Sequence, residues 1–101
     1  AGGIAALLAQ ATLVRTTGAE PYLASTLDGP VGIAAAVHAA AALRIGPACG
    51  LATLGLFTAP VPDALRPSGG SIAVPPGPGL GVDPDMAVVA KYRSGPVATV
   101  K

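Results

Sequence analysis

The stretch that decides the fold is PYLASTLDGPVGIAAAVHAAAAL, residues 21–43. Its short apolar run YLA (22–24) ends in the hydroxyl pair Ser25 and Thr26, a pattern that fits a buried parallel strand. The next residues, DGP (28–30), indicate a helix start, because Asp28 can cap free backbone amides and proline is tolerated in a first turn. An apolar run then continues to Leu43. The stretch therefore predicts a strand followed by a helix over 31–43.

Alternating helices and strands are also predicted on both sides of this stretch. Residues 4–17 place apolar side chains close to helical spacing, with Arg15 and Gly18 marking a helix end. After the helix breakers at 46–47, ACG (48–50) fits a second buried strand, and residues 51–58 fit another helix. An alternating order of helices and strands is typical of an α/β fold with parallel strands.

The pattern changes at Ala59, after which prolines and glycines are frequent enough to exclude a long helix. Within this part, SIAV (71–74) and GLGV (79–82) could form neighbouring short β segments. Residues 85–92 are expected to close as a short helix capped by Asp83 or Asp85.

The composition suggests a piece of a longer protein. The chain opens on AGG without an initiator methionine, and only 11% of its 101 residues are charged, against about 25% in an ordinary soluble domain. We therefore expect much of the solvated surface to belong to another segment of a longer protein. We accordingly expect the missing N-terminal part of the same protein to be a partner of this chain.

Charge and hydropathy exclude several function classes. The net charge is +1 and the basic residues are scattered, so we do not expect nucleic acid as a partner. The apolar run over 30–43 is shorter than the ~20 residues that cross a bilayer, so we do not expect a membrane span. The lone Cys49 cannot form an internal disulfide, which favours a reducing compartment and a cytoplasmic location.

Three segments together resemble a known family. PYLASTLDGPVGIAAAVHAAAAL, then PACGLATLGLF (47–57), then SIAVPPGPGLGVDPD (71–85) are similar to the C-terminal region of o-succinylbenzoate synthases of the enolase superfamily. In that family a strand ending in Ser-Ser leads to a helix beginning Val-Gly, then to a strand reading ACGLGT and a GPGLGV loop. This chain departs from the pattern at Ala52, where glycine is more usual.

The resemblance implies the last two strands of a (β/α)₇β barrel, at 22–26 and 48–50, with their helices. Residues 1–58 would be the C-terminal part of that barrel, and residues 59–101 an irregular segment that packs toward the capping domain. Active sites of such barrels lie at the C-terminal strand ends. Ser25, Thr26, Gly50 and Leu51 would therefore bind the substrate, a small carboxylate.

The reaction implied by the resemblance is the Mg²⁺-assisted dehydration of a cyclohexadiene carboxylate to o-succinylbenzoate, a lyase step in menaquinone biosynthesis. The family takes its basic lysines and its three metal-binding carboxylates from other strands. Here both lysines lie in the tail, and only Asp28 among the acidic residues sits at a predicted strand end. We therefore assign this chain no catalytic residue and no metal ligand, expect it to bind no Mg²⁺ by itself, and expect it to be inactive alone.

Several alternatives stay open. The hydroxyls of Ser25 and Thr26 could simply satisfy backbone groups in the turn before the helix. His38 lies mid-helix, with no nucleophile or acid spaced to work with it, and is interpreted as structural or exposed. The enzyme could instead be a muconate cycloisomerase or an N-acylamino acid racemase. A non-catalytic α/β fragment that acts as an interaction module is the alternative from a different class.

Overall fold

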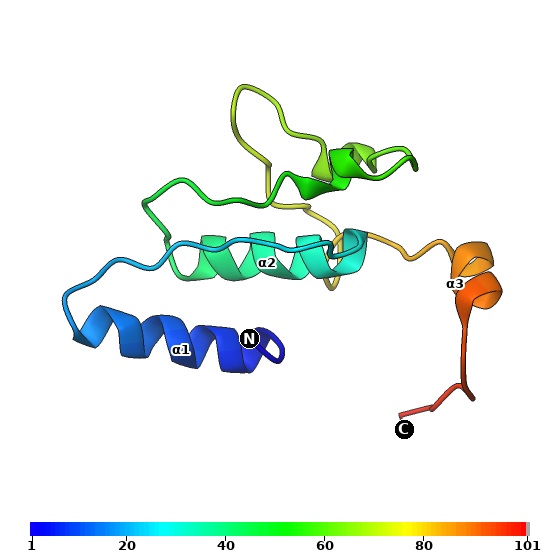
Figure 1. The fold of residues 1–101 in the computed structure, drawn as a ribbon, viewed down its shortest axis with the longest axis horizontal. Coiled ribbons are helices and arrows are strands. Elements are labelled where there is room, and N and C mark those ends of the chain that lie inside the picture. Colours follow the sequence, from blue (N-terminus) through cyan, green and yellow to red (C-terminus); the bar gives the residue numbers. More distant parts are fainter. Residues whose placement is uncertain (101) are drawn as a thin grey trace.

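The computed structural model describes residues 1–100, which form helices joined by long irregular segments (Figure 1). The elements in chain order are α1 (Ile4–Thr16), α2 (Pro30–Ala42), η1 (Thr53–Leu56), η2 (Asp63–Leu65) and α3 (Met86–Tyr92), where η denotes a 3₁₀ helix. The helices predicted over 4–17, 31–43 and 85–92 are confirmed, each with ends within one residue of the expected position.

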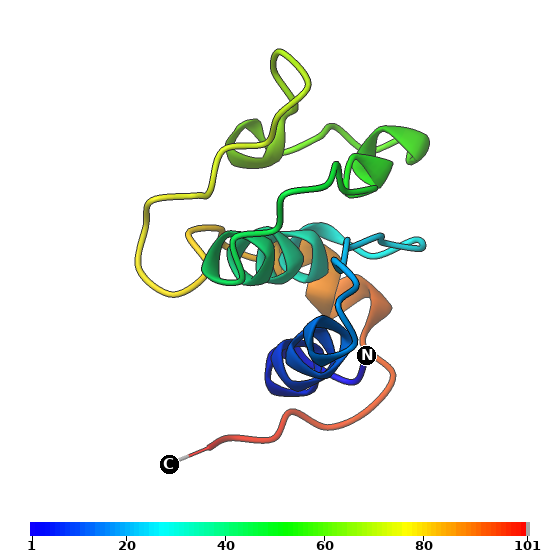
Figure 2. The ribbon, with the colours of Figure 1, turned by 90° about the vertical axis from the view of Figure 1, so that its left-hand side faces the viewer.

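The helix α2 lies in the middle of the molecule. Figures 1 and 2 show α1 on one side of it and the two 3₁₀ helices on the other. Contacts join α1 to α2 and α2 to η2, and α1 buries Ala11. The helix α3 lies beyond one end of α2 and buries none of its side chains.

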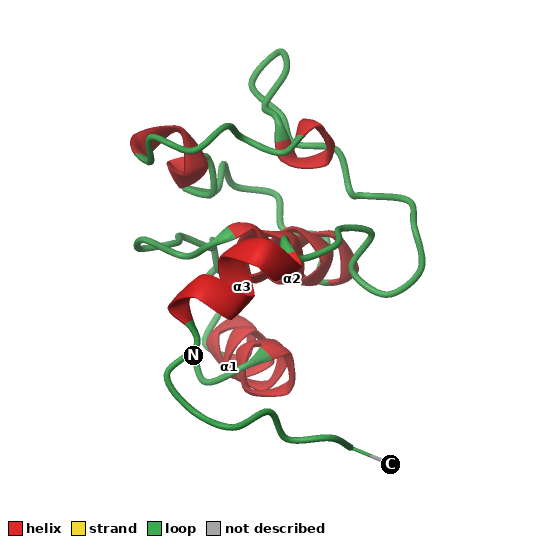
Figure 3. Ribbon diagram, turned by 90° about the vertical axis from the view of Figure 1, so that its right-hand side faces the viewer, coloured by secondary structure: helices red, strands yellow, loops and turns green. Residues whose placement is uncertain are grey.

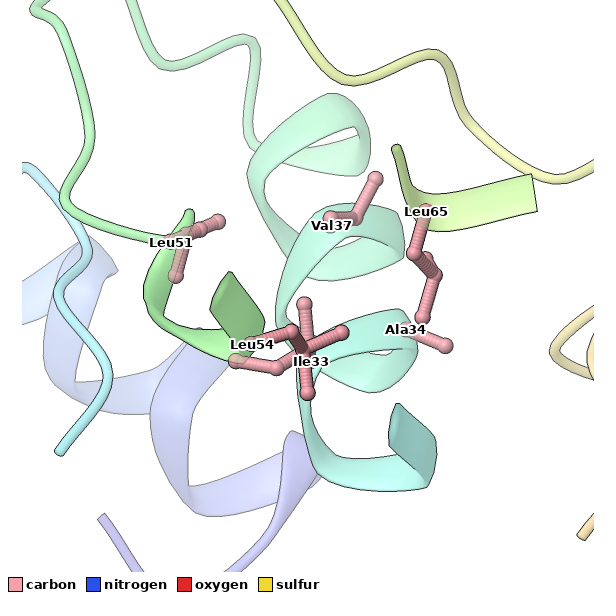
Figure 4. Packing of buried hydrophobic residues seen from close by; sticks show 6 residues of the cluster. All are labelled: Ile33, Ala34, Val37, Leu51, Leu54 and Leu65. Carbon is pink, nitrogen blue, oxygen red and sulfur yellow. The ribbon is translucent and has the colours of Figure 1, made fainter. Parts of the chain in front are cut away.

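One face of α2 carries the hydrophobic core. Ile33, Ala34 and Val37 are buried there and pack against side chains from the segment that follows, namely Leu51, Leu54 and Leu65 (Figure 4). The positions 33, 34 and 37 lie on one side of a helix because the α-helix repeats every 3.6 residues. Each fully buried aliphatic side chain of this kind contributes roughly 1.5–3 kcal/mol through the hydrophobic effect. The core is therefore built on a helix and not on a sheet.

The core covers only part of the apolar surface. The radius of gyration is 14.8 Å, whereas a compact domain of this length has a value of about 13 Å. Large apolar side chains stay exposed on several elements, including Leu13 of α1, Leu56 of η1 and Tyr22 before α2, each of which is at least 66% exposed. The described residues thus form an open arrangement around α2.

The predicted fold class is wrong for residues 1–100. The expected strands of a barrel, at 22–26 and 48–50, do not form, and Figure 3 shows helices and loops with no strand. What remains of the predicted pair is one isolated parallel bridge between Ala24 and Gly50. It consists of two hydrogen bonds, from Ser25 N to Gly50 O at 3.0 Å and from Gly50 N to Leu23 O at 2.7 Å.

The neighbouring residues explain why the pairing stops after one bridge. A longer parallel ladder would continue from Leu23 N to the backbone of residue 48, but this amide faces the Sγ of Cys49, at 3.4 Å. Both segments follow a proline, Pro21 or Pro47, which has no backbone N–H to donate. At the other end, Ala52 turns into η1 with φ −87° and ψ 38°. Neither segment therefore extends beyond its single bridge.

Two further expectations after α2 are corrected. The helix expected over 51–58 shrinks to the four residues of η1, where Gly55 lowers the helical propensity. The expected pair of β segments at 71–74 and 79–82 is replaced by an antiparallel bridge between Ser68 and Ser71. The tight turn between these serines uses Gly69 and Gly70, whose φ angles are 58° and 80°.

The ends of the helices follow local rules. Asp85 caps α3, accepting hydrogen bonds from Ala87 N at 3.0 Å and Val88 N at 3.2 Å. The C-terminus of α2 closes with hydrogen bonds from Arg44 N to Ala41 O and from Ile45 N to Ala40 O, the pattern of a Schellman motif. Arg44 takes the left-handed position of that motif with φ 50°.

The hydropathy of these helices bears on the membrane question. No helix within residues 1–100 has both the length and the apolar character that a membrane crossing requires.

Candidate functional site

Ser25 and Gly50, two of the residues predicted to bind substrate, lie together at the Ala24–Gly50 bridge. The Ser25 hydroxyl donates to Gly50 O across 3.1 Å, and the same carbonyl accepts the Ser25 backbone N–H at 3.0 Å. The site is therefore formed by segments 25 residues apart in the chain, and the Gly50 carbonyl accepts both hydrogen bonds from Ser25. In this arrangement the Ser25 hydroxyl satisfies a backbone group, which is the structural alternative that the sequence left open.

A second hydroxyl residue, Thr53, joins Ser25 and Gly50 in what we call the Ser25 cluster, and it was missed in the sequence. Its Oγ1 lies 2.7 Å from the Oγ of Ser25, and both side chains are half-buried. Thr53 is the first residue of η1, which turns back toward the bridge. The available signal was a hydroxyl residue three positions after Gly50. It was overlooked because residue 53 was assigned to the interior of a helix.

Thr26 and Asp28 form a separate turn beside the cluster. Thr26 is exposed, and its backbone N–H donates to the Asp28 carboxylate at 3.3 Å. The predicted capping role of Asp28 is wrong, because Gly29 is the N-cap of α2 and no side chain caps this end. The amides of the first turn of α2 are thus left without a side-chain acceptor.

Leu51, the fourth predicted site residue, is placed differently. Its side chain is 7% exposed and belongs to the core with Val37 and Leu54. Only the backbone of Leu51 therefore remains available for a ligand at the Ser25 cluster.

Four of the five acidic side chains have partners, each at a separate place in the structure. The Oε2 of Glu20 lies 3.6 Å from the Nη2 of Arg15, and the Oδ1 of Asp63 lies 2.8 Å from the Nη2 of Arg66. Asp85 caps α3 and Asp28 accepts the Thr26 amide. Within residues 1–100, no three His, Cys, Asp or Glu side chains come together at a point that could hold a metal ion. These residues do not fit the three-carboxylate Mg²⁺ site that the resemblance implies.

Apolar cavities flank the core, and two of them differ in their linings. One, of about 460 Å³, is lined by residues that include Val37, Arg44, Cys49 and Ile72. The other, of about 160 Å³, lies at the start of α2, between Pro30, Phe57 and Pro60. Neither cavity is lined by Ser25 or Thr26.

His38 has a structural contact. Its Nε2 lies 2.8 Å from Leu80 O, so the imidazole links α2 to the glycine-rich loop.

Comparisons with a family model and with individual proteins both place this chain near enolase-type enzymes. Residues 1–88 match the family described as enolase C-terminal domain-like. The chain is also similar to the o-succinylbenzoate synthases of Mycobacterium tuberculosis (strain H37Rv) and Mycobacterium bovis (strain BCG / Pasteur), with 45% identity over 74 residues. This match covers 72% of the chain and 22% of each relative, so the chain spans about a fifth of the length of these relatives. No solved structure matches it significantly.

The family match covers both halves of the Ser25 cluster, because Ser25, Gly50 and Thr53 all fall within residues 1–88. The chain therefore belongs to the enolase C-terminal domain-like family.

Proposed function

We propose that this chain is part of an o-succinylbenzoate synthase. The enzyme would dehydrate 2-succinyl-6-hydroxy-2,4-cyclohexadiene-1-carboxylate to o-succinylbenzoate, a lyase reaction in menaquinone biosynthesis. The observation that carries the proposal is the 45% identity over 74 residues with the mycobacterial o-succinylbenzoate synthases. Because the chain spans 22% of those relatives, the remaining parts of the active enzyme would come from other residues.

The contribution of this chain would be to bind a carboxylate of the substrate. Ser25 and Thr26 offer hydroxyl groups, and the uncapped first turn of α2 lies just after them. Backbone N–H groups at a helix N-terminus favour negative charge. The backbone at Gly50 and Leu51 would border the same ligand, since Gly50 O is bonded to Ser25.

The base that removes the proton and the ligands of the metal ion would come from other segments of the enzyme. In this reaction class a bound Mg²⁺ stabilises the negative charge that develops when a proton α to a carboxylate is removed. The carboxylates of residues 1–100 are dispersed and do not fit such a site, so we propose that other segments hold the metal ion and the base. The chain alone is expected to be inactive. A cytoplasmic location would suit its unpaired cysteine, Cys49.

The test is an assay of the complete reading frame that encodes the chain. The purified product is mixed with Mg²⁺ and the cyclohexadiene carboxylate, and o-succinylbenzoate is quantified by mass spectrometry. We expect conversion by the wild-type protein and a raised KM in Ser25→Ala. Ser68→Ala is a matched control, because Ser68 forms its bridge through the backbone.

The outcome that would contradict the proposal is an absence of dehydration in a folded protein with Mg²⁺ present. Parallel assays with a muconate lactone and with N-acylamino acids would then show whether the protein is a cycloisomerase or a racemase instead.

A further inference from the structure

The hydroxyls of Ser25 and Thr53 form a chain of hydrogen bonds that ends at Gly50 O. Gly50 O has no hydrogen, so the contact at 3.1 Å requires the Ser25 hydroxyl to donate. Ser25 has only one hydroxyl hydrogen, so whenever it donates to Gly50 O, Thr53 is the donor across the 2.7 Å contact between the two hydroxyl oxygens. The order of donation is therefore Thr53 to Ser25 to Gly50 O.

The two contacts differ in strength. Hydroxyl hydrogen bonds have a most common length of about 2.7–2.8 Å, so the contact between Thr53 and Ser25 is at the optimum. The contact from Ser25 to Gly50 O is longer, at 3.1 Å, and that carbonyl already accepts the Ser25 amide at 3.0 Å. Rotation of the Ser25 hydroxyl away from Gly50 O would thus leave the carbonyl with a partner and the shorter contact intact.

We infer that Thr53 is a positioning residue for the Ser25 hydroxyl, and that the pair binds a substrate carboxylate as one unit. When the carboxylate arrives, the Ser25 hydrogen turns from Gly50 O to the ligand, while Thr53 continues to donate to the Ser25 oxygen. A hydroxyl that accepts one hydrogen bond is a stronger donor of its own. This inference rests on the proposed function, which supplies the carboxylate ligand.

The experiment uses the complete protein that contains this chain and measures the Kd of o-succinylbenzoate by titration calorimetry, together with KM and kcat. Thr53→Val removes the hydroxyl while keeping the side-chain shape, and Thr53→Ser keeps the hydroxyl. We expect Thr53→Val to raise Kd and KM about fivefold with little change in kcat, and Thr53→Ser to restore both. Thr12→Val is the matched control, because the Thr12 hydroxyl bonds only within α1, to Leu8 O at 2.9 Å.

A combination with Ser25→Ala separates positioning from independent binding. If Thr53 acts through Ser25, adding Thr53→Val to Ser25→Ala causes no further rise in Kd. If the two effects multiply, Thr53 binds the ligand by itself and the inference is wrong. Thr53→Ala serves in the same scheme if the valine variant does not fold.

The failures of the two proposals are distinguishable. A wild-type protein that neither forms nor binds o-succinylbenzoate removes the proposed function, and the inference with it. A wild-type protein that does both, with unchanged Kd in Thr53→Val, overturns the inference alone. A loss of thermal stability with unchanged Kd in that variant also overturns it, because Thr53 would then be only structural.

Discussion

His38 and Leu80, which lie 42 residues apart, are joined by a hydrogen bond of 2.8 Å between the imidazole Nε2 and the backbone carbonyl. The carbonyl can only accept, so Nε2 carries the hydrogen. His38 follows the buried Val37 in α2, and Leu80 itself packs against the same core. The contact therefore fixes the glycine-rich loop to the helix that organises the molecule.

We predict that His38→Ala destabilises the protein by about 1 kcal/mol, the net contribution of one hydrogen bond whose acceptor is left in a half-buried place. The measurement is urea unfolding at constant pH. His38→Gln is the control, because its side-chain amide can still donate to Leu80 O and should recover part of the loss. Equal stability of both variants and the wild type would show that the contact does not hold the loop.

The loop itself is closed by Gly81. Its φ is 72°, and a Cβ at this position would lie 2.6 Å from the Cβ of Pro75. Gly79 has a similar φ of 63°, but nothing lies within 4 Å of its Cβ position. The two glycines thus share the same backbone conformation and differ in their surroundings.

We predict a larger loss of stability for Gly81→Ala than for Gly79→Ala. Gly79→Ala should cost about 1–2 kcal/mol for the left-handed backbone alone. Gly81→Ala should add about 1–3 kcal/mol, because the buried Pro75 must move. Thermal unfolding of the two purified variants checks the difference, and equal midpoints would contradict the close approach of residues 75 and 81.

The cap of α3 gives a local prediction. This helix has seven residues and buries none of them, and so short a helix is marginal without further support. Asp85→Ala removes an acceptor for two amides and should cost about 1 kcal/mol. Amide hydrogen exchange in residues 87–92 should then be about fivefold faster. Asp83→Ala is the matched control, since the cap is Asp85, and equal acceleration by both changes would refute the assignment.

The sequence predicted the helices well because their signals are local. Each signal acts within a few residues: Pro30 in the first turn of α2, Gly18 after α1, and the Asp85 cap of α3. The residues of each segment are therefore enough to predict its helix. The predicted strands were wrong because a strand depends on neighbours along its whole length. Residues 22–26 and 48–50 do meet, but only at Ala24 and Gly50.

At the candidate site, the sequence indicated where two of the residues lie, and their role in binding stays a prediction. The meeting of Ser25 with Gly50 was expected, since both residues were placed at adjacent strand ends, and the structure brings them together. Thr53 was missed because its role depends on how η1 folds back, and Leu51 was placed at the site although its side chain turns into the core. The direction of a side chain after a turn depends on packing that no local pattern encodes.

The end of α2 supplies the last prediction. Arg44 takes the left-handed position of the Schellman motif, with φ 50°, where glycine is the usual residue. A left-handed backbone costs an ordinary residue roughly 1–2 kcal/mol, which glycine avoids. Glycine loses more conformational freedom on folding, however, and this loss offsets part of the gain. We therefore expect Arg44→Gly to stabilise the protein by about 0.5–1 kcal/mol in urea unfolding. The hydrogen bond from Arg15 to Arg44 O should survive, because its acceptor is the backbone carbonyl of residue 44.

The reciprocal control is Gly18→Ala at the end of α1, where φ is 85° and nothing lies within 4 Å of the added Cβ. That change should destabilise the protein by about 1 kcal/mol. If Arg44→Gly instead lowers the stability, the Arg44 side chain contributes contacts along the neighbouring cavity that outweigh the strain of its backbone.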